Sequence, residues 1–137
     1  MNQLSDSAQE MLAEFSACKG WEQRARLLLK YGQQLPALPA VSRTDGNLIR
    51  GCESPVWCVV RWPEGRLELQ LDTDARLLKG LLAVLRTRLE GLNVEHLQAA
   101  DLPDWFAQLG LAGKISTSRS NGLNAVYQHI LGLTRNE

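Results

Sequence analysis

Hydrophobic residues near the N-terminus recur at the three- and four-residue spacing of helices. They predict one helix that ends near Gly20 and a second that runs from Trp21 to about Gly32. The apolar stripe of the first helix is Met11, Leu12, Phe15 and Cys18, and that of the second is Trp21, Ala25, Leu28, Leu29 and Gly32. Arg24, Arg26 and Lys30 are expected to face water. A loop from Leu35 to Arg50 follows, and a loop of this length inside a domain is often functional.

After this loop the hydrophobic period changes to two, which is typical of strands with one buried face. The inward-facing residues are predicted to be Val56, Cys58, Val60 and Trp62 on one strand and Leu67, Leu69 and Leu71 on the next. Glu68, Gln70 and Asp72 alternate with the leucines and are expected to form a wet face. Pro63-Glu64-Gly65 has the composition of a tight turn, so we predict an antiparallel hairpin. A short third strand is expected near Asn47 to Ile49.

Helical spacing then returns for the rest of the chain. A broad leucine stripe from Leu77 to Leu89 predicts a helix that is capped by Thr73 or Asp74 and stopped by Gly91. Short helices are expected over 94–99 and 103–109, and a last helix carries Leu123, Val126, Tyr127, Ile130 and Leu131. Segregated helices and strands of this kind predict an α+β fold, with helices covering a small antiparallel β-sheet.

Length and charge narrow the class of protein. The chain has 137 residues, 45% of them hydrophobic and 22% charged, which is enough for one globular domain over residues 1–137. Lys plus Arg and Asp plus Glu each number 15, so the net charge is zero and nucleic acid is not an expected partner. We expect no membrane partner either, because neither a spanning segment nor a secretory signal is apparent. Three cysteines in such a chain predict reduced thiols in the cytoplasm.

Cys52 is the strongest candidate for chemistry. It lies in Arg50-Gly51-Cys52-Glu53-Ser54-Pro55, where Gly51 permits an unusual backbone angle and Pro55 removes a backbone donor. Such a bend can present a thiol to a partner, although a small buried apolar residue is the commoner role of a free cysteine. Cys18 and Cys58 are predicted to be core residues. The spacing between Cys52 and Cys58 is too long for a zinc knuckle, so no metal or cofactor is predicted.

A second candidate is the hydroxyl-rich stretch from Ser116 to Gly122. Its hydroxyls are expected to cap the last helix, where free N–H groups favour an anion, and Arg119 adds a permanent charge. From the local sequence alone, an ordinary capped helix with a solvated Arg119 is the favoured interpretation. Most of the four tryptophans, Trp21, Trp57, Trp62 and Trp105, are expected to anchor the core. Trp57 is also placed to wall a pocket for the sulfur of Cys52.

These segments resemble the SufE-type sulfur acceptors, which are partners of cysteine desulfurases. The matching pieces run nearly from end to end of the chain. They are Trp21-Glu22, Leu35-Pro36-Ala37-Leu38-Pro39, Ile49 to Trp57 with its Gly-Cys-Glu block, Lys79 to Leu85, and Ser118-Arg119-Ser120-Asn121-Gly122-Leu123. Within this SufE/CsdE family, Glu53 and the stretches from Gly80 to Leu85 and Gly122 to Ala125 are similar to the CsdE branch.

The resemblance implies a fold related to the iron–sulfur scaffold proteins (SufE/IscU-like) and assigns Cys52 as the residue that receives sulfur. Arg119 and Asp74 match a basic and an acidic position of the family, and Gly51, Glu53 and Trp57 flank the site. The implied role is that of an accessory protein, not an enzyme, that forms a persulfide on Cys52 and stimulates the desulfurase. It would then relay the sulfur to a cluster scaffold or a tRNA-modification protein. We expect a monomer or a weak homodimer.

Two alternatives remain open from the sequence. One is a scaffold that assembles a cluster on Cys18, Cys52 and Cys58, and the other is a regulator that acts on the desulfurase by docking alone. If Cys52 is the acceptor, it must react as the thiolate, whose formation Arg50 or Arg119 would favour and Glu53 would oppose. We expect a resting Cys52 that is buried and is extruded on binding, because a persulfide needs shelter between partners.

Overall fold

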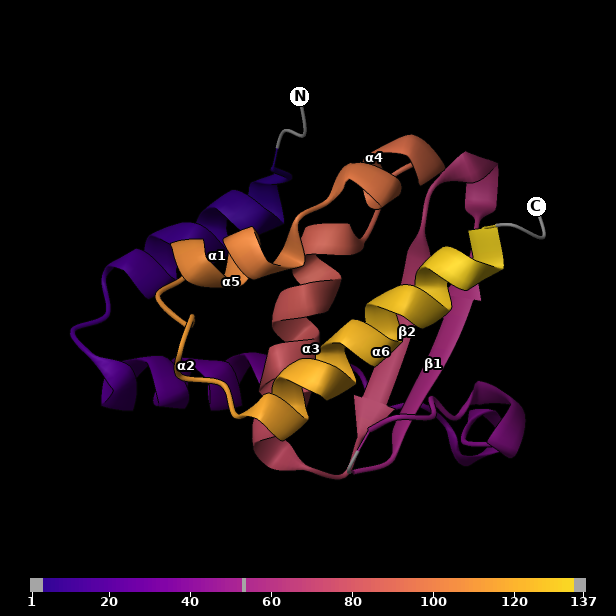
Figure 1. Cartoon of the computed structure of the whole chain (residues 1–137), viewed down its shortest axis with the longest axis horizontal. Coiled ribbons are helices and arrows are strands. Elements are labelled where there is room, and N and C mark those ends of the chain that lie inside the picture. The colour runs from indigo at the N-terminus through magenta and orange to yellow at the C-terminus, as the bar shows by residue number, and fades with distance from the viewer. Residues whose placement is uncertain (1–3, 53, 135–137) are drawn as a thin grey trace.

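The computed structural model describes residues 4–52 and 54–134. Its helices are α1 (Asp6–Ser16), α2 (Trp21–Gln34), α3 (Arg76–Leu89), α4 (Val94–Ala99), α5 (Leu102–Gln108) and α6 (Thr117–Leu133). Its strands are β1 (Val56–Arg61) and β2 (Glu68–Thr73), and single 3₁₀ turns occupy 40–42, 45–47 and 63–65 (Figure 1). None of the helices in the described ranges is long and apolar enough to cross a membrane.

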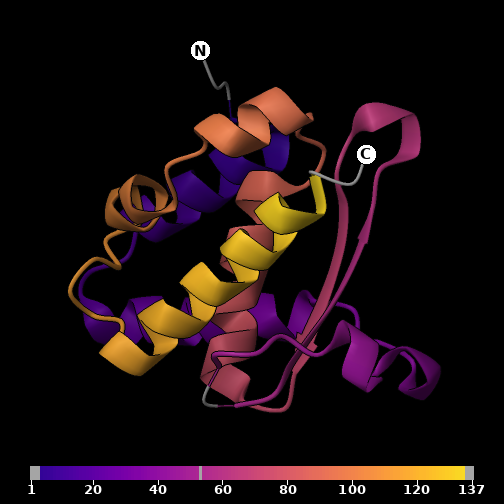
Figure 2. The ribbon, with the colours of Figure 1, turned by 45° about the vertical axis from the view of Figure 1, so that its right-hand side comes forward.

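The two strands form an antiparallel hairpin that is covered by helices, as the hydrophobic pattern predicted. Val56 pairs with Thr73 at one end of the ladder and Arg61 with Glu68 at the other. The helices gather on one side of this hairpin, while the segment that follows α2 extends on the other side (Figure 2). The predicted α+β fold is therefore confirmed.

Leucines supply most of the core between the hairpin and the helices. Leu69 and Leu71 of β2 and Val56 and Cys58 of β1 are buried, which confirms the core position of Cys58 and the inward face at these positions. Val60 and Trp62, predicted on the same face, are half-buried. Trp105 is also buried, and its indole Nε1 donates to the carbonyl oxygen of Val84 on α3 at 3.1 Å. It is the only tryptophan to be fully buried, because Trp21, Trp57 and Trp62 each keep part of their surface in water.

Helices α2 and α3 pack at their closest where two glycines face each other. A Cβ on Gly80 would lie 2.7 Å from the carbonyl carbon of Leu28, and a Cβ on Gly32 would lie 2.9 Å from the amide nitrogen of Gly80. Backbone atoms cannot rotate away as side chains can, so this contact requires a residue without a side chain. The close packing fixes the position of α3, whose first turn borders the candidate site.

The first helix and the third strand differ from the expectation. Helix α1 ends at Ser16, so Cys18 lies beyond it, half-buried, with its thiol 3.6 Å from the carbonyl oxygen of Glu14. The core position expected for Cys18 is therefore wrong. Residues 47–49 form no strand: a 3₁₀ turn ends at Asn47, and a single bridge joins Leu48 to Trp57. Residues 47–49 are therefore positioned by this single bridge and not by a continuous ladder of hydrogen bonds.

The expected caps of α3 and the expected solvation of Arg24 are also corrected. The residue before α3 is Ala75, which makes no side-chain cap hydrogen bond. The hydroxyl of Thr73 donates to the carbonyl oxygen of Pro55 and accepts from the N–H of Ala75 at 3.4 Å, before the first helical residue, and the Asp74 carboxylate pairs with Arg43. Arg24 is half-buried and its Nε donates to the carbonyl oxygen of Leu109 at 3.2 Å. Both differences arise from contacts between segments that are distant in sequence.

Candidate functional site

Cys52 lies in the tip of a narrow loop whose two arms are joined at the base. The backbone N–H of Ile49 donates to the carbonyl oxygen of Val56 at 2.8 Å, and Leu48 and Trp57 form an antiparallel bridge. The hydroxyl of Thr73 in turn donates to the carbonyl oxygen of Pro55 at 2.7 Å. The tip, of which residues 50–52, 54 and 55 are described, is therefore anchored to the hairpin at its base while Cys52 itself lies beyond the ladder.

The tip folds back against the middle of α6. Gly51 adopts a φ of 96°, a conformation that favours glycine, and the chain thereby brings Cys52 against the helix. The thiol of Cys52 lies 3.6 Å from the carbonyl oxygen of Gly122, and a Cβ on Gly122 would lie 3.5 Å from the same sulfur. A side chain larger than a methyl group at residue 122 would therefore compete with the half-buried sulfur for this space.

A cavity of about 400 Å³ opens beside this sulfur. It is lined by Cys52, Ser54, Ala75, Leu78, Ser116, Ser118, Arg119 and Gly122. The first turns of α3 and α6 therefore meet at the cavity, and the N-terminus of a helix favours an anion. The predicted cap of the last helix is confirmed, since the hydroxyl oxygen of Ser116 accepts from the N–H of Arg119 at 3.2 Å. The resulting site has a nucleophile on one wall and positive helix ends on the others.

The resting thiol is held in its protonated form. Burial raises the pKa of Cys52 above its ordinary value. The contact of the thiol with the Gly122 carbonyl oxygen has the same consequence, because only the protonated sulfur can donate to an acceptor. The expected enrichment of the thiolate by Arg50 or Arg119 is therefore absent from this state: Arg50 is exposed, and Arg119 lines the cavity with its side chain largely in water.

Trp57 and Asp74 are grouped around Arg43 and do not line this cavity. The Arg43 guanidinium lies 4.6 Å from the centroid of the Trp57 ring and 3.0 Å from the Asp74 carboxylate. Of the other residues expected at the site, Gly51 and Arg119 border Cys52, whereas Glu53 lies outside the described residues.

Asp72 is a buried residue that the alternating pattern wrongly placed on the wet face. Its side chain has no exposed surface and accepts from Arg43 at 2.7 Å, from the N–H of Leu38 at 2.8 Å and from Lys79 at 3.3 Å. Burial alone would raise the pKa of Asp72, but these hydrogen bonds, with one from the N–H of Thr73, outweigh it and hold the pKa below the ordinary value. The segment after α2 covers this carboxylate through Leu38 and Arg43. The local sequence around Asp72 does not predict that this distant segment folds over it.

The three cysteines are not brought together. Cys58 lies in the core of the hairpin, Cys18 lies beyond the end of α1, and Cys52 contacts α6. Among residues 4–52 and 54–134, no three His, Cys, Asp or Glu side chains are grouped so as to hold a metal ion. This arrangement offers no support for the alternative of a cluster scaffold on Cys18, Cys52 and Cys58.

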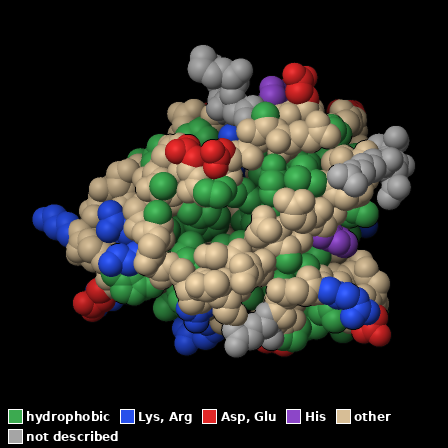
Figure 3. Space-filling view, viewed as in Figure 1, with side chains coloured by type: hydrophobic (Ala, Val, Ile, Leu, Met, Phe, Trp, Pro, Cys, Tyr) green, Lys and Arg blue, Asp and Glu red, His purple; other side chains and the backbone are tan. Residues whose placement is uncertain are grey.

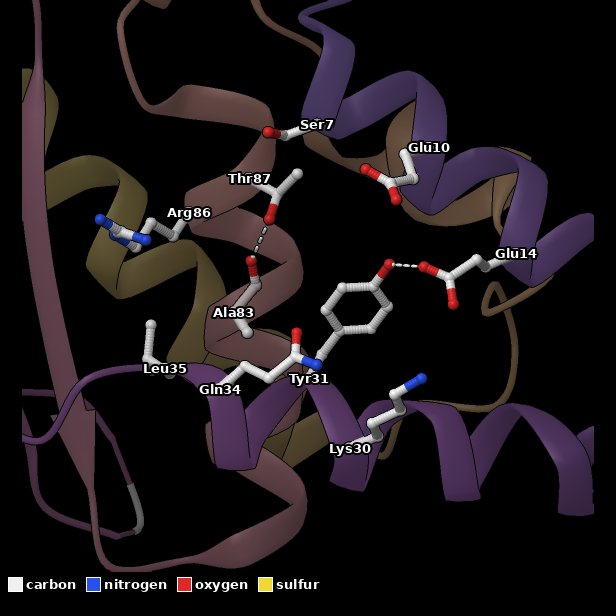
Figure 4. A pocket seen from close by; sticks show the side chains of 10 residues that line it. All are labelled: Ser7, Glu10, Glu14, Lys30, Tyr31, Gln34, Leu35, Ala83, Arg86 and Thr87. Carbon is white, nitrogen blue, oxygen red and sulfur yellow. Dashed lines mark hydrogen bonds between the residues drawn. The ribbon is translucent and has the colours of Figure 1, made fainter.

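A second cavity, of about 440 Å³, lies among α1, α2 and α3. Figure 4 shows the hydroxyl of Tyr31 donating to the Glu14 carboxylate and the hydroxyl of Thr87 donating to the carbonyl oxygen of Ala83 at 2.9 Å. Burial, followed by the bond to Glu14, raises the pKa of Tyr31. The bond between Tyr31 and Glu14 joins α2 to α1, whereas that between Thr87 and Ala83 lies within α3. No cysteine is among the described residues that line this cavity, so it lacks the thiol of the Cys52 site.

Comparison with known proteins gives the family of the chain. The family profile described as SufE, Fe-S metabolism associated domain, matches residues 9–134. The Sulfur acceptor protein CsdE of Escherichia coli (strain K12) is 38% identical over 130 residues, which cover 94% of this chain and 88% of that protein. The solution structure of a hypothetical protein from Thermus thermophilus has a TM-score of 0.76 at 21% identity, with 98% of this chain and 97% of that chain covered, and supports the fold alone. The resemblance noted in the sequence is confirmed: the chain belongs to the SufE family and is similar to its CsdE members.

Proposed function

We propose that this protein is a sulfur carrier that accepts a sulfur atom from a cysteine desulfurase onto Cys52 and passes it to another protein. The observation that carries the proposal is the position of Cys52, at an anchored loop tip and beside a cavity bordered by two helix N-termini. The 38% identity to a protein named as a sulfur acceptor supports it. Neither observation identifies the protein that receives the sulfur.

The proposed reaction is a transfer between two thiols without net oxidation. The Cys52 thiolate attacks the outer sulfur of a cysteine persulfide on the donor, and the bond between the two donor sulfurs breaks as the new S–S bond forms. The donor cysteine leaves as a thiolate, and Cys52 becomes the persulfide. Delivery to the next protein repeats the exchange with Cys52 as the leaving group.

Presentation and activation of Cys52 are coupled in this proposal. The described part of the tip contacts α6 through Cys52 and Gly122, while its base is fixed by the Ile49 and Thr73 hydrogen bonds. The tip can therefore move outward about its base without unfolding the hairpin. Because burial is what raises the pKa of Cys52, the same movement increases the thiolate fraction when a donor is present.

The cavity would accommodate the added sulfur once the tip returns. A persulfide is one atom longer than the thiol, and the outer sulfur carries the negative charge. The first turns of α3 and α6 favour that charge, and the apolar side chains of Ala75 and Leu78 limit access by reductants. Arg119, at the rim, is proposed to contribute positive charge toward the same sulfur, whereas Asp74 and Trp57 support the position of the loop through Arg43.

Mass spectrometry after mixing with a cysteine desulfurase and free cysteine tests the acceptor role. We expect the intact protein to gain one sulfur atom, peptide mapping to locate it on Cys52, and a reductant to remove it. The Cys18→Ser variant is the matched control and should gain sulfur normally, while Cys52→Ser should gain none.

The alternative of a docking-only regulator makes the opposite prediction for Cys52→Ser. Such a regulator would stimulate desulfurase turnover fully without this thiol, whereas a carrier would not. Absence of added sulfur while the desulfurases tested turn over cysteine would contradict the acceptor role for those enzymes.

A further inference from the structure

An apolar groove of about 530 Å³ lies on the other flank of α6 from the Cys52 cavity. Its walls include Leu102, Pro103 and Phe106 of α5, Leu111 and Ile115 of the connection to α6, and Leu123 of α6. Figure 3 shows hydrophobic side chains gathered in the hollow between α5 and α6. An open hollow of this composition is typical of a site that takes an apolar side chain from a partner.

Charged side chains are nearly absent from the described lining of this groove. Asp101 is the one charged residue among those that line it, and its carboxylate is already engaged in capping α5 through the N–H of Asp104 at 3.0 Å. Residues 120–134 contain no Lys, Arg, Asp or Glu, although 22% of the chain is charged. In Figure 3 the Lys and Arg side chains lie mostly around the margin of this face, whereas a group of acidic side chains lies beside the hollow. Depletion of charge is a property of the centres of protein interfaces.

The groove is continuous with the sulfur site across a single helix. Ser118, Arg119 and Gly122 line the Cys52 cavity, and Ser120 and Asn124 line the groove. Between the two flanks, α6 exposes small uncharged side chains, Thr117 and Asn121 among them, which lose little conformational freedom on burial. A protein that reaches Cys52 over the start of α6 therefore meets Arg119 at the rim of the cavity, then the uncharged side chains of Thr117 and Asn121, and then the apolar groove.

We propose that this surface, the exposed side of α6 with the groove beside it, is where the cysteine desulfurase docks, and that an apolar side chain of the desulfurase occupies the groove. The proposal rests on the proposed function for the identity of the partner. The groove would position the donor while the tip with Cys52 moves, so that affinity and sulfur transfer are supplied by opposite flanks of α6.

Binding of a purified cysteine desulfurase to Cys52→Ser tests this surface without the need for sulfur transfer. On that background, Asn124→Arg and Asn124→Glu should each raise the dissociation constant at least about tenfold, as expected when a charge is placed in an uncharged interface. Ser120→Arg should do the same. Gln33→Arg, which places the same charge on the exposed side of α2, is the control and should leave the dissociation constant within about twofold.

The outcomes separate this inference from the proposed function. Unchanged affinity in both Asn124 variants overturns the docking surface, even if Cys52 of the unaltered chain gains sulfur. Weaker binding with only one sign of charge also overturns it, because that result indicates a charged interface. At saturating desulfurase, Asn124→Arg with Cys52 present should still reach full sulfur loading, whereas a loss of loading at saturation would show that Asn124 acts on the transfer and not on docking.

Discussion

The thiol of Cys52 lies 3.6 Å from the carbonyl oxygen of Gly122, although 70 positions separate the two residues in the sequence. A Cβ on Gly122 would meet the same sulfur at 3.5 Å, so an alanine would just fit and a larger side chain would not. The glycine of α6 thus decides whether the resting thiol remains in its cavity.

Substitution of this glycine should expose the thiol. We expect Gly122→Leu to displace Cys52 outward and to increase its alkylation rate by iodoacetamide at pH 7 several-fold, because the displaced thiol is more accessible and loses the burial that raises its pKa. Gly132→Leu is the control on the same helix, since nothing lies within 4 Å of a Cβ there. Equal rates in the two variants would show that Gly122 does not hold the thiol in place.

The pH dependence of alkylation reports the burial of Cys52 directly. Burial raises the pKa of Cys52, so the folded protein should need a higher pH than the urea-unfolded chain to reach the same thiolate fraction. The rate for Cys52, located by peptide mass spectrometry, should therefore rise through a pH above the ordinary thiol pKa of about 8.5. The two profiles should coincide if the cavity does not act on the thiol.

Asp72 should stabilise the fold strongly at neutral pH. Asp72→Asn is expected to lower the free energy of unfolding by about 3 kcal/mol, the lower end for breaking a buried ion pair, because Arg43 and Lys79 keep access to water. Asp74→Asn removes an exposed partner of the same arginine and should cost less than about 1 kcal/mol. Urea unfolding at pH 7 measures both.

Acid should remove the contribution of Asp72 to the free energy of unfolding. Its pKa is lowered in the folded state, so its contribution is complete above the unfolded pKa of about 3.9 and is lost as the pH falls through the folded value. The difference in stability between the unaltered protein and Asp72→Asn should therefore shrink below about pH 4. A difference that stays constant down to pH 2 would contradict the ionised, paired state of Asp72.

The contact between α2 and α3 should not tolerate a methyl group. Gly80→Ala is expected to destabilise the protein by about 1–3 kcal/mol, despite the better helix propensity of alanine, because the new Cβ would meet the backbone of Leu28. Gly132→Ala has open space and should instead stabilise by up to about 1 kcal/mol. Thermal unfolding of the two variants should therefore shift the melting temperature in opposite directions.

The sequence pattern predicted helices and strands well where their hydrophobic residues recur at a single regular spacing. The alternation around Cys58 and Leu69 placed the hairpin, and the leucine stripe of α3 placed the central helix, because buried faces impose these periods on any sequence. The Gly-Cys-Glu block around Cys52 singled out the candidate nucleophile through the family that it resembles. None of these inferences requires knowledge of which faces meet.

Tertiary structure alone decided the environment of those elements. Asp72 alternates like an exposed residue and is buried because a segment about thirty positions earlier folds over it, and Cys18 leaves the core because α1 ends before it. The protonated state of Cys52 likewise follows from its contact with α6, which no local pattern contains. The sequence by itself determined the periodicity and led to the prediction of Cys52 as the sulfur acceptor. The pKa of Cys52, the cavity and the groove depend instead on contacts between distant segments, whose energies a local pattern does not encode.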